Sequence, residues 1–219
     1  MRKKRENGLI IVGLFFICAS MFTGIIQEIG TIKNIQKDAE NLKIQIACLK
    51  ILKNKKIGDS IAVDGCCQTV TGIFKDSFEV QAIPETLRCT NFKNFKKGTK
   101  VNLESSLKVG DSLDGHFVLG HVDDITICYS HKNSKNGYIL TFGIPKNLKK
   151  YIVYKGSVAI NGVSLTIAKV EQKSYSIAII PYTLENTNLG SIKEGDEVNV
   201  EGDVLAKYNP SGIIDYRLK

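Results

Sequence analysis

The chain carries one stretch of sequence twice. Residues 57–104 and residues 154–201 align at a constant offset of 97 residues without a gap, and sixteen of the 48 aligned positions are identical. The identical pairs include Gly65/Gly162 and Pro84/Pro181. A repeat of this length is too long for a solenoid, so it indicates two similar domains in tandem.

The length of 219 residues leaves room for two domains of ordinary size. We expect the first domain to span residues 21–114 and the second residues 115–208, with a short tail at 209–219. Gly and Asp residues at 110–115 are turn signals that predict a tight join between the domains, without a flexible linker.

Both copies show short apolar alternations, separated by Gly, Asn and Asp. In the first copy they cover residues 60–63, 66–73, 77–83 and 101–103. This spacing predicts an all-β barrel or sandwich in each half. Short helical turns are expected at 145–151, at a counterpart near 49–53, and at 203–208.

Residues 1–20 differ from the rest of the chain. Four basic residues at positions 2–5 precede an uncharged apolar run at 8–20, which is shorter than the roughly 20 residues that cross a bilayer. The segment is either a signal peptide or a start codon assigned upstream of Met21. The six cysteines include no CxxC pair, which favours free thiols in a reducing compartment and therefore the second interpretation.

The charge pattern argues against a nucleic-acid interface. The formal net charge is +8, but the basic residues are spread over both copies and are not interleaved with aromatic residues. The densest run, residues 53–56, is expected to be a solvated loop. No phosphate-binding loop and no set of three metal ligands is recognisable, so no cofactor or metal is expected.

Alternation along a strand places Ser164 and Thr166 on one face and Val163, Leu165 and Ile167 on the other. The first copy has Cys67 and Thr69 at the positions of Ser164 and Thr166. Each domain therefore offers a nucleophilic or hydrogen-bonding pair at a matching place, although Ser and Thr also suit any half-exposed strand. Gln68 would share the core face, where its amide needs hydrogen-bond partners.

Two further patterns could contact a ligand. The pattern Ile-Pro-x-Thr-Leu occurs at 83–87 and 180–184, where a proline at the end of a strand leaves backbone groups free to read the edge of a flat heterocycle. The alternative is a turn that only ends the strand. In the stretch 115–121, His121 follows a glycine, so it could approach a ligand closely and move a proton near neutral pH.

These motifs, in this order, resemble the riboflavin synthase family (alpha-chain type). The resemblance covers residues 21–208 and rests on the segments 21–25, 64–70, 85–87, 101–104, 115–121, 154–156, 161–166 and 183–187. It implies two six-stranded Greek-key β-barrels in tandem, a short C-terminal helix and a homotrimer. It also implies a cytoplasmic transferase that associates in some cases with lumazine synthase and has no membrane or nucleic-acid partner.

The reaction that the resemblance implies is a dismutation. Two molecules of 6,7-dimethyl-8-ribityllumazine react, and a four-carbon unit passes from one to the other. The products are riboflavin and 5-amino-6-ribitylaminouracil, and no cofactor takes part. In the family the reaction is thought to occur between the first barrel of one subunit and the second barrel of its neighbour.

The resemblance also implies site residues. The proton-transfer group would be His121, with Ser164 and Thr166 as ring orienters or a nucleophile, Cys67 and Ser60 in similar roles in the first barrel, and Lys155 and Asp203 in lesser polar roles. The first barrel's ring contacts would be Gly24, Ile25, Ile26, Cys67, Gln68, Thr69, Gln81, Ala82, Ile83, Pro84, Glu85 and Thr86. The second barrel's would be Gly120, His121, Val122, Lys155, Ser164, Leu165, Thr166, Ala178, Ile179, Ile180, Pro181, Tyr182 and Thr183.

The chain departs from the family pattern in three places. Asn161 stands where an acidic residue is usual, while Asp64 holds the equivalent position in the first copy. Gln68 replaces a leucine, and Pro210 interrupts a tail that in the family helps to build the trimer. Two alternatives remain open: a lumazine protein that binds the ligand without reaction, and a flavin-reductase-type barrel, which would need a nucleotide-binding domain for which this chain has no room.

Overall fold

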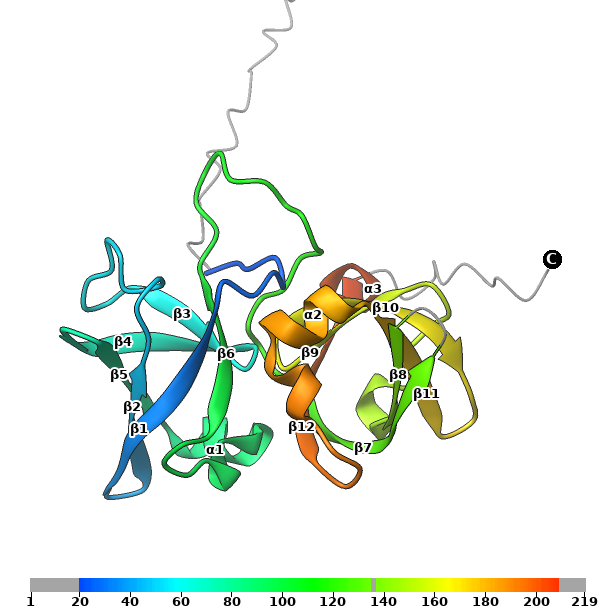
Figure 1. The fold of residues 1–219 in the computed structure, drawn as a ribbon, viewed down its shortest axis with the longest axis horizontal. Coiled ribbons are helices and arrows are strands. Elements are labelled where there is room, and N and C mark those ends of the chain that lie inside the picture. Colours follow the sequence, from blue (N-terminus) through cyan, green and yellow to red (C-terminus); the bar gives the residue numbers. More distant parts are fainter. Residues whose placement is uncertain (1–19, 135–136, 209–219) are drawn as a thin grey trace, which may run out of the picture.

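The structure is a computed structural model, and it describes residues 20–134 and 137–208. Within these residues the chain forms two closed antiparallel barrels of six strands each, which lie beside one another (Figure 1). The prediction of two tandem β-barrels is confirmed. The expectations for positions 1–19, including Cys18, and for the tail at 209–219 lie outside the described residues.

Each barrel closes in the same strand order. The first is ordered β1-β2-β5-β4-β3-β6 and the second β10-β11-β8-β7-β12-β9. The non-consecutive neighbours, such as β2 with β5 and β3 with β6, give the Greek-key connectivity that was expected. The strands are β1 (Glu28–Asp38), β2 (Asn41–Ala47), β3 (Ser60–Val63), β4 (Cys66–Phe74), β5 (Ser77–Ala82), β6 (Lys100–Ser105), β7 (Asp124–Ser134), β8 (Gly137–Gly143), β9 (Ser157–Ile160), β10 (Val163–Val170), β11 (Ser174–Ile179) and β12 (Glu197–Gly202).

The helices are short. They are α1 (Pro84–Cys89), α2 (Pro181–Asn186) and α3 (Val204–Tyr208), with 3-10 turns η1 (Asn91–Asn94), η2 (Lys146–Leu148) and η3 (Asn188–Ser191). Two pairs of them, α1 with α2 and η1 with η3, occupy matching places in the two copies. The predicted C-terminal helix is confirmed as α3. The turn expected at 145–151 is reduced to η2, and residues 49–53 form turns without a helix.

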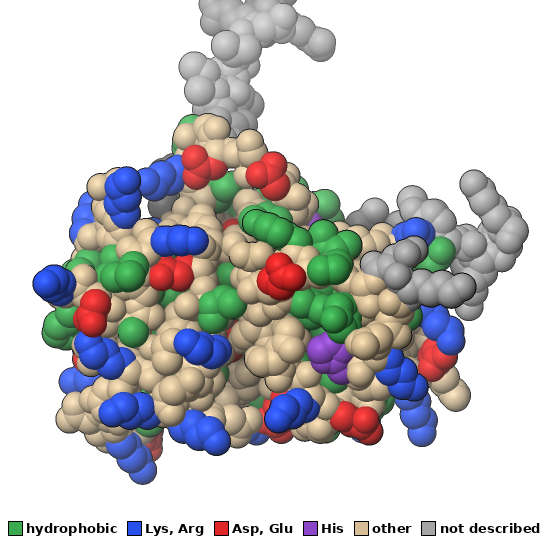
Figure 2. Space-filling view, viewed as in Figure 1, with side chains coloured by type: hydrophobic (Ala, Val, Ile, Leu, Met, Phe, Trp, Pro, Cys, Tyr) green, Lys and Arg blue, Asp and Glu red, His purple; other side chains and the backbone are tan. Residues whose placement is uncertain are grey.

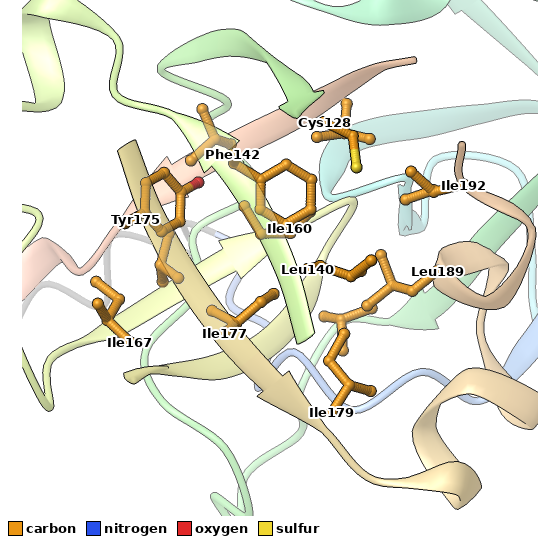
Figure 3. Close-up of a cluster of buried hydrophobic side chains, with 14 of the residues drawn as sticks. Cys128, Leu140, Phe142, Ile160, Ile167, Tyr175, Ile177, Ile179, Leu189 and Ile192 are labelled. Atoms are coloured by element: carbon orange, nitrogen blue, oxygen red, sulfur yellow. The ribbon is translucent and has the colours of Figure 1, made fainter. Parts of the chain in front are cut away.

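Alternation along the strands fills each barrel with its own apolar core. In β11 the residues Tyr175, Ile177 and Ile179 point inward and are buried, while the residues between them lie toward solvent. Figure 3 shows the second core, where Tyr175 packs against Phe142 with ring centroids 5.8 Å apart. Because each domain buries a separate core, each barrel has the means to be stable in its own right.

The connection between the barrels is long, which corrects the prediction of a tight join. It runs from the end of β6 at Ser105 to the start of β7 at Asp124, and Figure 1 shows it as a green loop that extends away from the barrels. Turn residues at 110–114 bend this loop at its exposed tip, whereas Gly115 packs against Thr23 and Ser164, where an added Cβ would lie 1.9 Å from the Thr23 carbonyl oxygen.

The segment before each barrel docks between the barrels. We call residues 21–27 the first lead and residues 116–123 the second lead. Phe22 and Val118, both buried, pair as an antiparallel bridge with N–O distances of 2.7 and 3.1 Å. Each lead then contacts the opposite barrel: the Ser164 amide donates to the Gly24 carbonyl at 2.8 Å, and the Cys67 amide donates to the Gly120 carbonyl at 2.8 Å.

A buried glutamate fixes each lead. Glu104, at the end of β6, accepts hydrogen bonds from the amides of Thr23 and Gly24 at 2.7 and 3.1 Å. Glu201, at the equivalent place in β12, accepts from the amides of Leu119 and Gly120 at 2.7 and 3.0 Å. Burial raises the pKa of Glu104 and raises that of Glu201 to about 7. Glu104 and Glu201 are therefore identical in the two copies because each holds the lead that docks against it.

The two barrels meet at Gly65 and Gly162. Each has a positive φ, 77° and 78°, and a Cβ added to either one would lie 2.6 to 2.7 Å from the amide nitrogen of the other. Only glycine permits both the backbone conformation and this approach.

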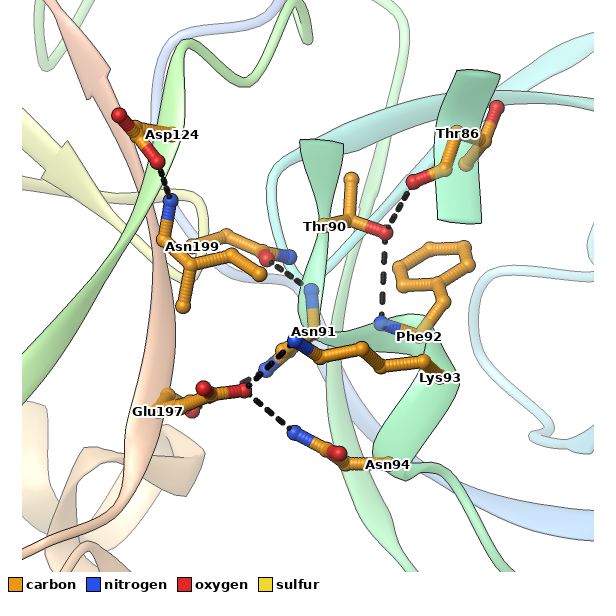
Figure 4. Close-up of polar contacts among 10 residues, drawn as sticks. Thr86, Thr90, Asn91, Phe92, Lys93, Asn94, Asp124, Glu197 and Asn199 are labelled. Atoms are coloured by element: carbon orange, nitrogen blue, oxygen red, sulfur yellow. Dashed lines mark hydrogen bonds and ion pairs between the residues drawn. The ribbon is translucent and has the colours of Figure 1, made fainter. Parts of the chain in front are cut away.

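Buried amides surround this contact in a nearly twofold arrangement. The backbone N–H of Asn188 donates to Asn102 Oδ1 at 2.7 Å, and the backbone N–H of Asn91 donates to Asn199 Oδ1 at 2.8 Å. Figure 4 shows the Asn91 side of the network, where Asn94 and Lys93 also contact Glu197 of the other barrel. The asparagine pairs that are identical in the repeat therefore join the barrels.

The symmetry of this network fails at Asp64. Asn161 donates its amide to Asn188 Oδ1 at 3.3 Å, but at the equivalent place an ionised Asp64 has no proton to donate, and Asn91 Oδ1 is buried without a partner among the described residues. Burial raises the pKa of Asp64 to about 7. The position that departs from the family pattern thus lies between the barrels, where Asn161 is a hydrogen-bond donor rather than an acid.

Replacing Asp64 by Asn should stabilise the protein at pH 8 and have little effect near pH 4. Because the folded pKa is raised, the stability linked to Asp64 is fully present below its unfolded pKa, near 3.8, and is lost as the pH rises through about 7. The loss is up to about 1.4 kcal/mol per pH unit, and the Asp64→Asn substitution removes it while supplying an amide donor for Asn91. Urea unfolding across this pH range measures the effect, with the exposed Asp114→Asn as control; the same pH slope in both variants would contradict it.

Candidate active site

The predicted site residues form two similar open faces. The first-barrel face comprises Cys67 and Thr69 of β4 with Ser60 of β3. The second-barrel face comprises Ser164 and Thr166 of β10 with Ala178 of β11. On each face the middle residues alternate as predicted, with Thr69 and Thr166 exposed and Cys67 and Ser164 half-buried. The alternation predicted for the two strands is confirmed, and each polar pair lies on the outer side of its strand.

On the second-barrel face, Ser164 has a histidine partner. His116 Nδ1 lies 2.7 Å from Ser164 Oγ, and the His116 amide donates to the Thr23 carbonyl at 3.1 Å. The imidazole is thus held by the second lead, by the first lead and by β10 together. A hydroxyl that is hydrogen-bonded to an imidazole can be deprotonated or can relay a proton.

The surroundings of His116 keep its imidazole neutral. Burial lowers the pKa of His116, and the nearby carboxylate of Asp203 opposes this only in part. His116 Nε2 is buried and has no hydrogen-bond partner within residues 20–134 and 137–208. A neutral imidazole has one nitrogen free to accept a proton, so this pair is suited to act as a base at neutral pH.

The first-barrel face has hydroxyls where the second has the imidazole. Ser20 stands two residues before Phe22, as His116 stands two residues before Val118, and its hydroxyl donates to Ser60 Oγ at 2.5 Å. Burial raises the pKa of the Cys67 thiol, against hydrogen bonds from Ser60 and Ser20 that lower it. The thiol is therefore protonated at neutral pH. The two faces share a backbone frame and differ in their ionisable groups.

The Ile-Pro-x-Thr-Leu patterns begin helices. Pro84 and Pro181 occupy the first turn of α1 and α2, a position that suits proline because the missing N–H has no partner there. The residues before them, Ile83 and Ile180, are 52% and 59% exposed. These apolar side chains are therefore available for contact with a flat ring. As the sequence predicted, the prolines follow the strand ends: β5 ends at Ala82 and β11 at Ile179, one residue before each isoleucine.

The predicted ring contacts in the two leads lie against the opposite barrel from the one expected. Gly24 and Ile26 of the first lead lie against the second barrel, since Gly24 bonds Ser164 and Ile26 packs on the second core. Gly120 and Val122 of the second lead lie against the first barrel. The assignment of each lead to its own barrel is wrong, because the leads cross.

Four predicted contacts face inward, three of them buried. Ala82 and Ile179 are buried in the barrel cores, so their side chains cannot meet a ligand on the open faces. Gln68 is also buried, and its amide donates to the Cys67 carbonyl at 2.7 Å and approaches Cys66 Sγ at 3.3 Å. Leu165 is half-buried and packs against the second core. The need of Gln68 for partners is thus met within its own strand.

The remaining predicted residues lie at the rims. Lys155 is exposed, with its ammonium 5.5 Å from the centre of the Tyr154 ring. Ile25, Pro84, Glu85, Pro181 and Tyr182 are exposed, and Gln81, Thr86 and Thr183 are half-exposed. His121 is exposed and follows Gly120, so it belongs to the first-barrel face and not to the second.

Sequence reasoning chose His121 and passed over His116. The signal that distinguishes them is the position of each within the second lead: His116 precedes the bridge residue Val118 and His121 follows it. An alignment of the two leads at an offset of 96 places His116 opposite Ser20 and His121 opposite Ile25. That alignment would have shown that the histidines serve different faces.

Other kinds of site receive no support among the described residues. No group of three or more His, Cys, Asp or Glu side chains in residues 20–134 and 137–208 is arranged to hold a metal ion. Over the same residues, no helix is both long and apolar enough to traverse a bilayer. Cys48, Cys66, Cys67, Cys89 and Cys128 are free thiols.

The fold and its two faces define a class of protein, the tandem lumazine-binding barrel. The family model described as "Lumazine binding domain" matches residues 23–106 and 119–203. Among solved structures, LumP in complex with riboflavin is similar with a TM-score of 0.77 and 31% identity over 83% of this chain and 98% of that one. LumP in complex with 6,7-dimethyl-8-(1'-D-ribityl) lumazine has a TM-score of 0.75 and 29% identity, over 82% of this chain and 98% of that one.

Several curated relatives within this class are riboflavin synthases. The riboflavin synthase of Bacillus subtilis is 39% identical over 188 residues, covering 86% of this chain and 87% of the relative. That of Schizosaccharomyces pombe is 40% identical over 191 residues, covering 86% and 91%. That of Brucella abortus is 38% identical over 193 residues, covering 86% and 96%. The chain belongs to the riboflavin synthase family.

Proposed function

We propose that the chain catalyses the dismutation of two 6,7-dimethyl-8-ribityllumazine molecules to riboflavin and 5-amino-6-ribitylaminouracil. The observation that carries the proposal is the pair of like faces with unlike polar groups. The faces share a backbone frame, as two copies of one substrate require. They differ in their polar groups: the second-barrel face has an imidazole bonded to the Ser164 hydroxyl, and the first-barrel face has the Cys67 thiol with the hydrogen-bonded hydroxyls of Ser20 and Ser60.

The chemistry needs that difference. One lumazine must lose a proton from the methyl group on carbon 7, which is acidic because the ring delocalises the resulting anion. The other must be activated for attack, and it then accepts the four-carbon unit. One substrate therefore needs a base and the other needs groups that hold and polarise its ring, which a single kind of face would not supply.

We assign the base to the second-barrel face. Neutral His116 accepts a proton through Ser164 Oγ, and the Ser164 amide is bound to the Gly24 carbonyl, so the hydroxyl has a fixed orientation. Cys67 is a protonated thiol at neutral pH and acts on the first-barrel face as a hydrogen-bond donor and ring orienter, together with Ser60 and Thr69. Lys155 and His121, both exposed, are left as groups at the rims.

The two rings must also be pressed together. Holding two reactants in a productive orientation can contribute about 7–11 kcal/mol to lowering the barrier. Both faces of this chain are open, with Thr69, Thr166 and Tyr182 exposed. The first-barrel face of one subunit and the second-barrel face of a neighbour would close on each other in a homotrimer. Association with lumazine synthase would supply the substrate, and the free thiols fit a cytoplasmic location.

A riboflavin assay tests the function. The full chain is incubated with the lumazine, and the absorbance of riboflavin is followed while both products are quantified. We expect one riboflavin and one diaminouracil for every two lumazines consumed. LumP, a protein of the same fold, is described as complexed with lumazine, riboflavin and flavin mononucleotide, so binding alone is the competing function. Stable binding of the lumazine without riboflavin would establish that competitor.

A further inference from the structure

The hydroxyl of Ser20 reaches the first-barrel face from outside the residues 21–208 that carry the family resemblance. Ser20 is half-buried, and it donates a hydrogen bond to Ser60 Oγ at 2.5 Å. Ser60 is the first residue of β3, where it pairs with Thr69 of β4, so it lies beside the polar pair of this face. A side chain that precedes the first domain as the sequence delimits it is therefore part of the polar surface of that domain.

The backbone after Ser20 is anchored, so the position of its side chain is defined. The Met21 carbonyl accepts a hydrogen bond from the Leu107 amide at 2.7 Å, and the Phe22 amide donates to the Val118 carbonyl at the same distance. The Phe22 side chain is fully buried. Because the two residues that follow are fixed in this way, holding the Ser20 hydroxyl in place costs little further conformational entropy.

Ser20 also acts on the thiol at the centre of the face. Burial raises the pKa of Cys67, and the hydroxyls of Ser60 and Ser20 hold that pKa below the value that burial alone would give. A hydroxyl stabilises a thiolate in this way only from close by. The two hydroxyls and the thiol therefore form one small polar cluster on the first barrel.

The second copy supports its own face from the same place in the chain. Ser20 and His116 each stand two residues before the bridge between the leads. His116 bonds Ser164, and Ser20 acts on Cys67, the residue that matches Ser164 in the repeat. Each copy thus supports the central polar residue of a face from this position, with a hydroxyl in the first copy and an imidazole in the second.

We propose that Ser20 is a positioning residue for the substrate that rests on the first-barrel face. It orients the hydroxyl of Ser60, and together the two hydroxyls hold the Cys67 thiol toward the ring. A hydroxyl has one proton, and because Ser20 donates its own to Ser60, the Ser60 proton stays free for the thiol or the ring. The inference rests on the proposed function, since the ring held there is the lumazine, and Ser20 acts on it only through its neighbours.

Steady-state kinetics of full-length variants test this role. Ser20→Ala should lower kcat for riboflavin formation by about three- to tenfold, the effect expected for the loss of one hydrogen bond. Ser20→Thr keeps the hydroxyl and should keep most of the activity. Ser112→Ala is the matched control, because it removes an exposed hydroxyl from the tip of the connection, which projects at the top of the molecule in Figure 2. The control should keep kcat within about twofold of the parent.

A double-variant cycle separates action through Ser60 from a general loss of structure. If Ser20 acts through Ser60, adding Ser20→Ala to Ser60→Ala should lower kcat by less than about twofold, although Ser20→Ala alone has its full effect. The proposal would be overturned if the two losses multiplied independently, if Ser20→Ala left kcat unchanged, or if Ser20→Thr were as damaging as Ser20→Ala.

Alkylation of Cys67 gives a second readout that needs no turnover. The thiolate reacts with iodoacetamide, and mass spectrometry of the peptides follows Cys67 and Cys89 in the same sample across a range of pH. Ser20→Ala removes a hydroxyl that lowers the pKa of the Cys67 thiol, so the midpoint of its alkylation should move to higher pH while that of Cys89 stays in place. If the parent chain forms no riboflavin, the proposed function fails, and this midpoint decides whether Ser20 holds the thiol. An unmoved midpoint would contradict that role.

Discussion

Replacing His116 by Ala should lower kcat for riboflavin formation by about 10²–10⁴-fold, while the Kd for the lumazine changes only a few fold. His116 is the ionisable side chain hydrogen-bonded to Ser164, and its neutral imidazole is the proposed proton acceptor. The ring lies behind Ser164 and supplies little of the exposed surface on which a substrate would rest. Stopped-flow or steady-state absorbance gives kcat, and quenching of lumazine fluorescence gives Kd.

Two companion variants separate catalysis from folding. Ser164→Ala leaves the imidazole and removes its partner, so it should cause a similar loss of kcat without opening a space around His116. His121→Ala changes an exposed histidine on the other face and should lower kcat by less than about tenfold. If His121→Ala were as damaging as His116→Ala, the base would have to be placed on the first-barrel face.

The pH profile gives an independent readout. Because burial lowers the pKa of His116, the imidazole is neutral above a pKa that is below its ordinary value near 6.5. The parent kcat should therefore rise with pH through that pKa and then stay level around neutrality. In the His116→Ala variant the rising limb should disappear, which a purely structural role for the ring would not produce.

The sequence predicted what depends on local pattern. Alternation placed Cys67 with Thr69 and Ser164 with Thr166 on matching faces, and the strand boundaries at 60–63, 66–73 and 77–83 fall within one residue of β3, β4 and β5. The duplication predicted two barrels, and the side-chain period of two predicted which residues fill them.

The sequence did not predict where irregular segments dock. The leads have neither strand nor helix periodicity, so nothing local indicates that Gly24 meets Ser164 or that Gly120 meets Cys67. Those contacts depend on the packing of the barrels through Gly65 and Gly162, which is known only once both barrels exist. The sequence favoured His121 over His116 for the same reason, because the docking of the second lead could not be predicted.

The buried asparagine side chains between the barrels should contribute strongly to the stability of the fold. Replacing Asn188 by Ala should destabilise the protein by about 3 kcal/mol or more. Its Oδ1 accepts from Asn102 and Asn161 at 2.9 and 3.3 Å, and its Nδ2 donates to Asp64 and to the Lys100 carbonyl at 2.9 and 3.2 Å. Removing the amide leaves these buried groups with fewer partners and takes a donor from a buried carboxyl.

Asn91→Ala is a matched control because Asn91 occupies the equivalent position in the first copy and is equally buried. Among the described residues its Oδ1 has no partner and its Nδ2 makes a single contact of 3.4 Å with the Glu197 carbonyl, so the loss should be about 1 kcal/mol or less. Urea unfolding followed by circular dichroism measures both variants.

Because the Asn188 side-chain hydrogen bonds join residues of both barrels, Asn188→Ala should also separate the unfolding transition into two, with one barrel unfolding before the other. Equal losses in the two variants would mean that the barrels are held together by the glycine contact and the leads, and that the amides add little.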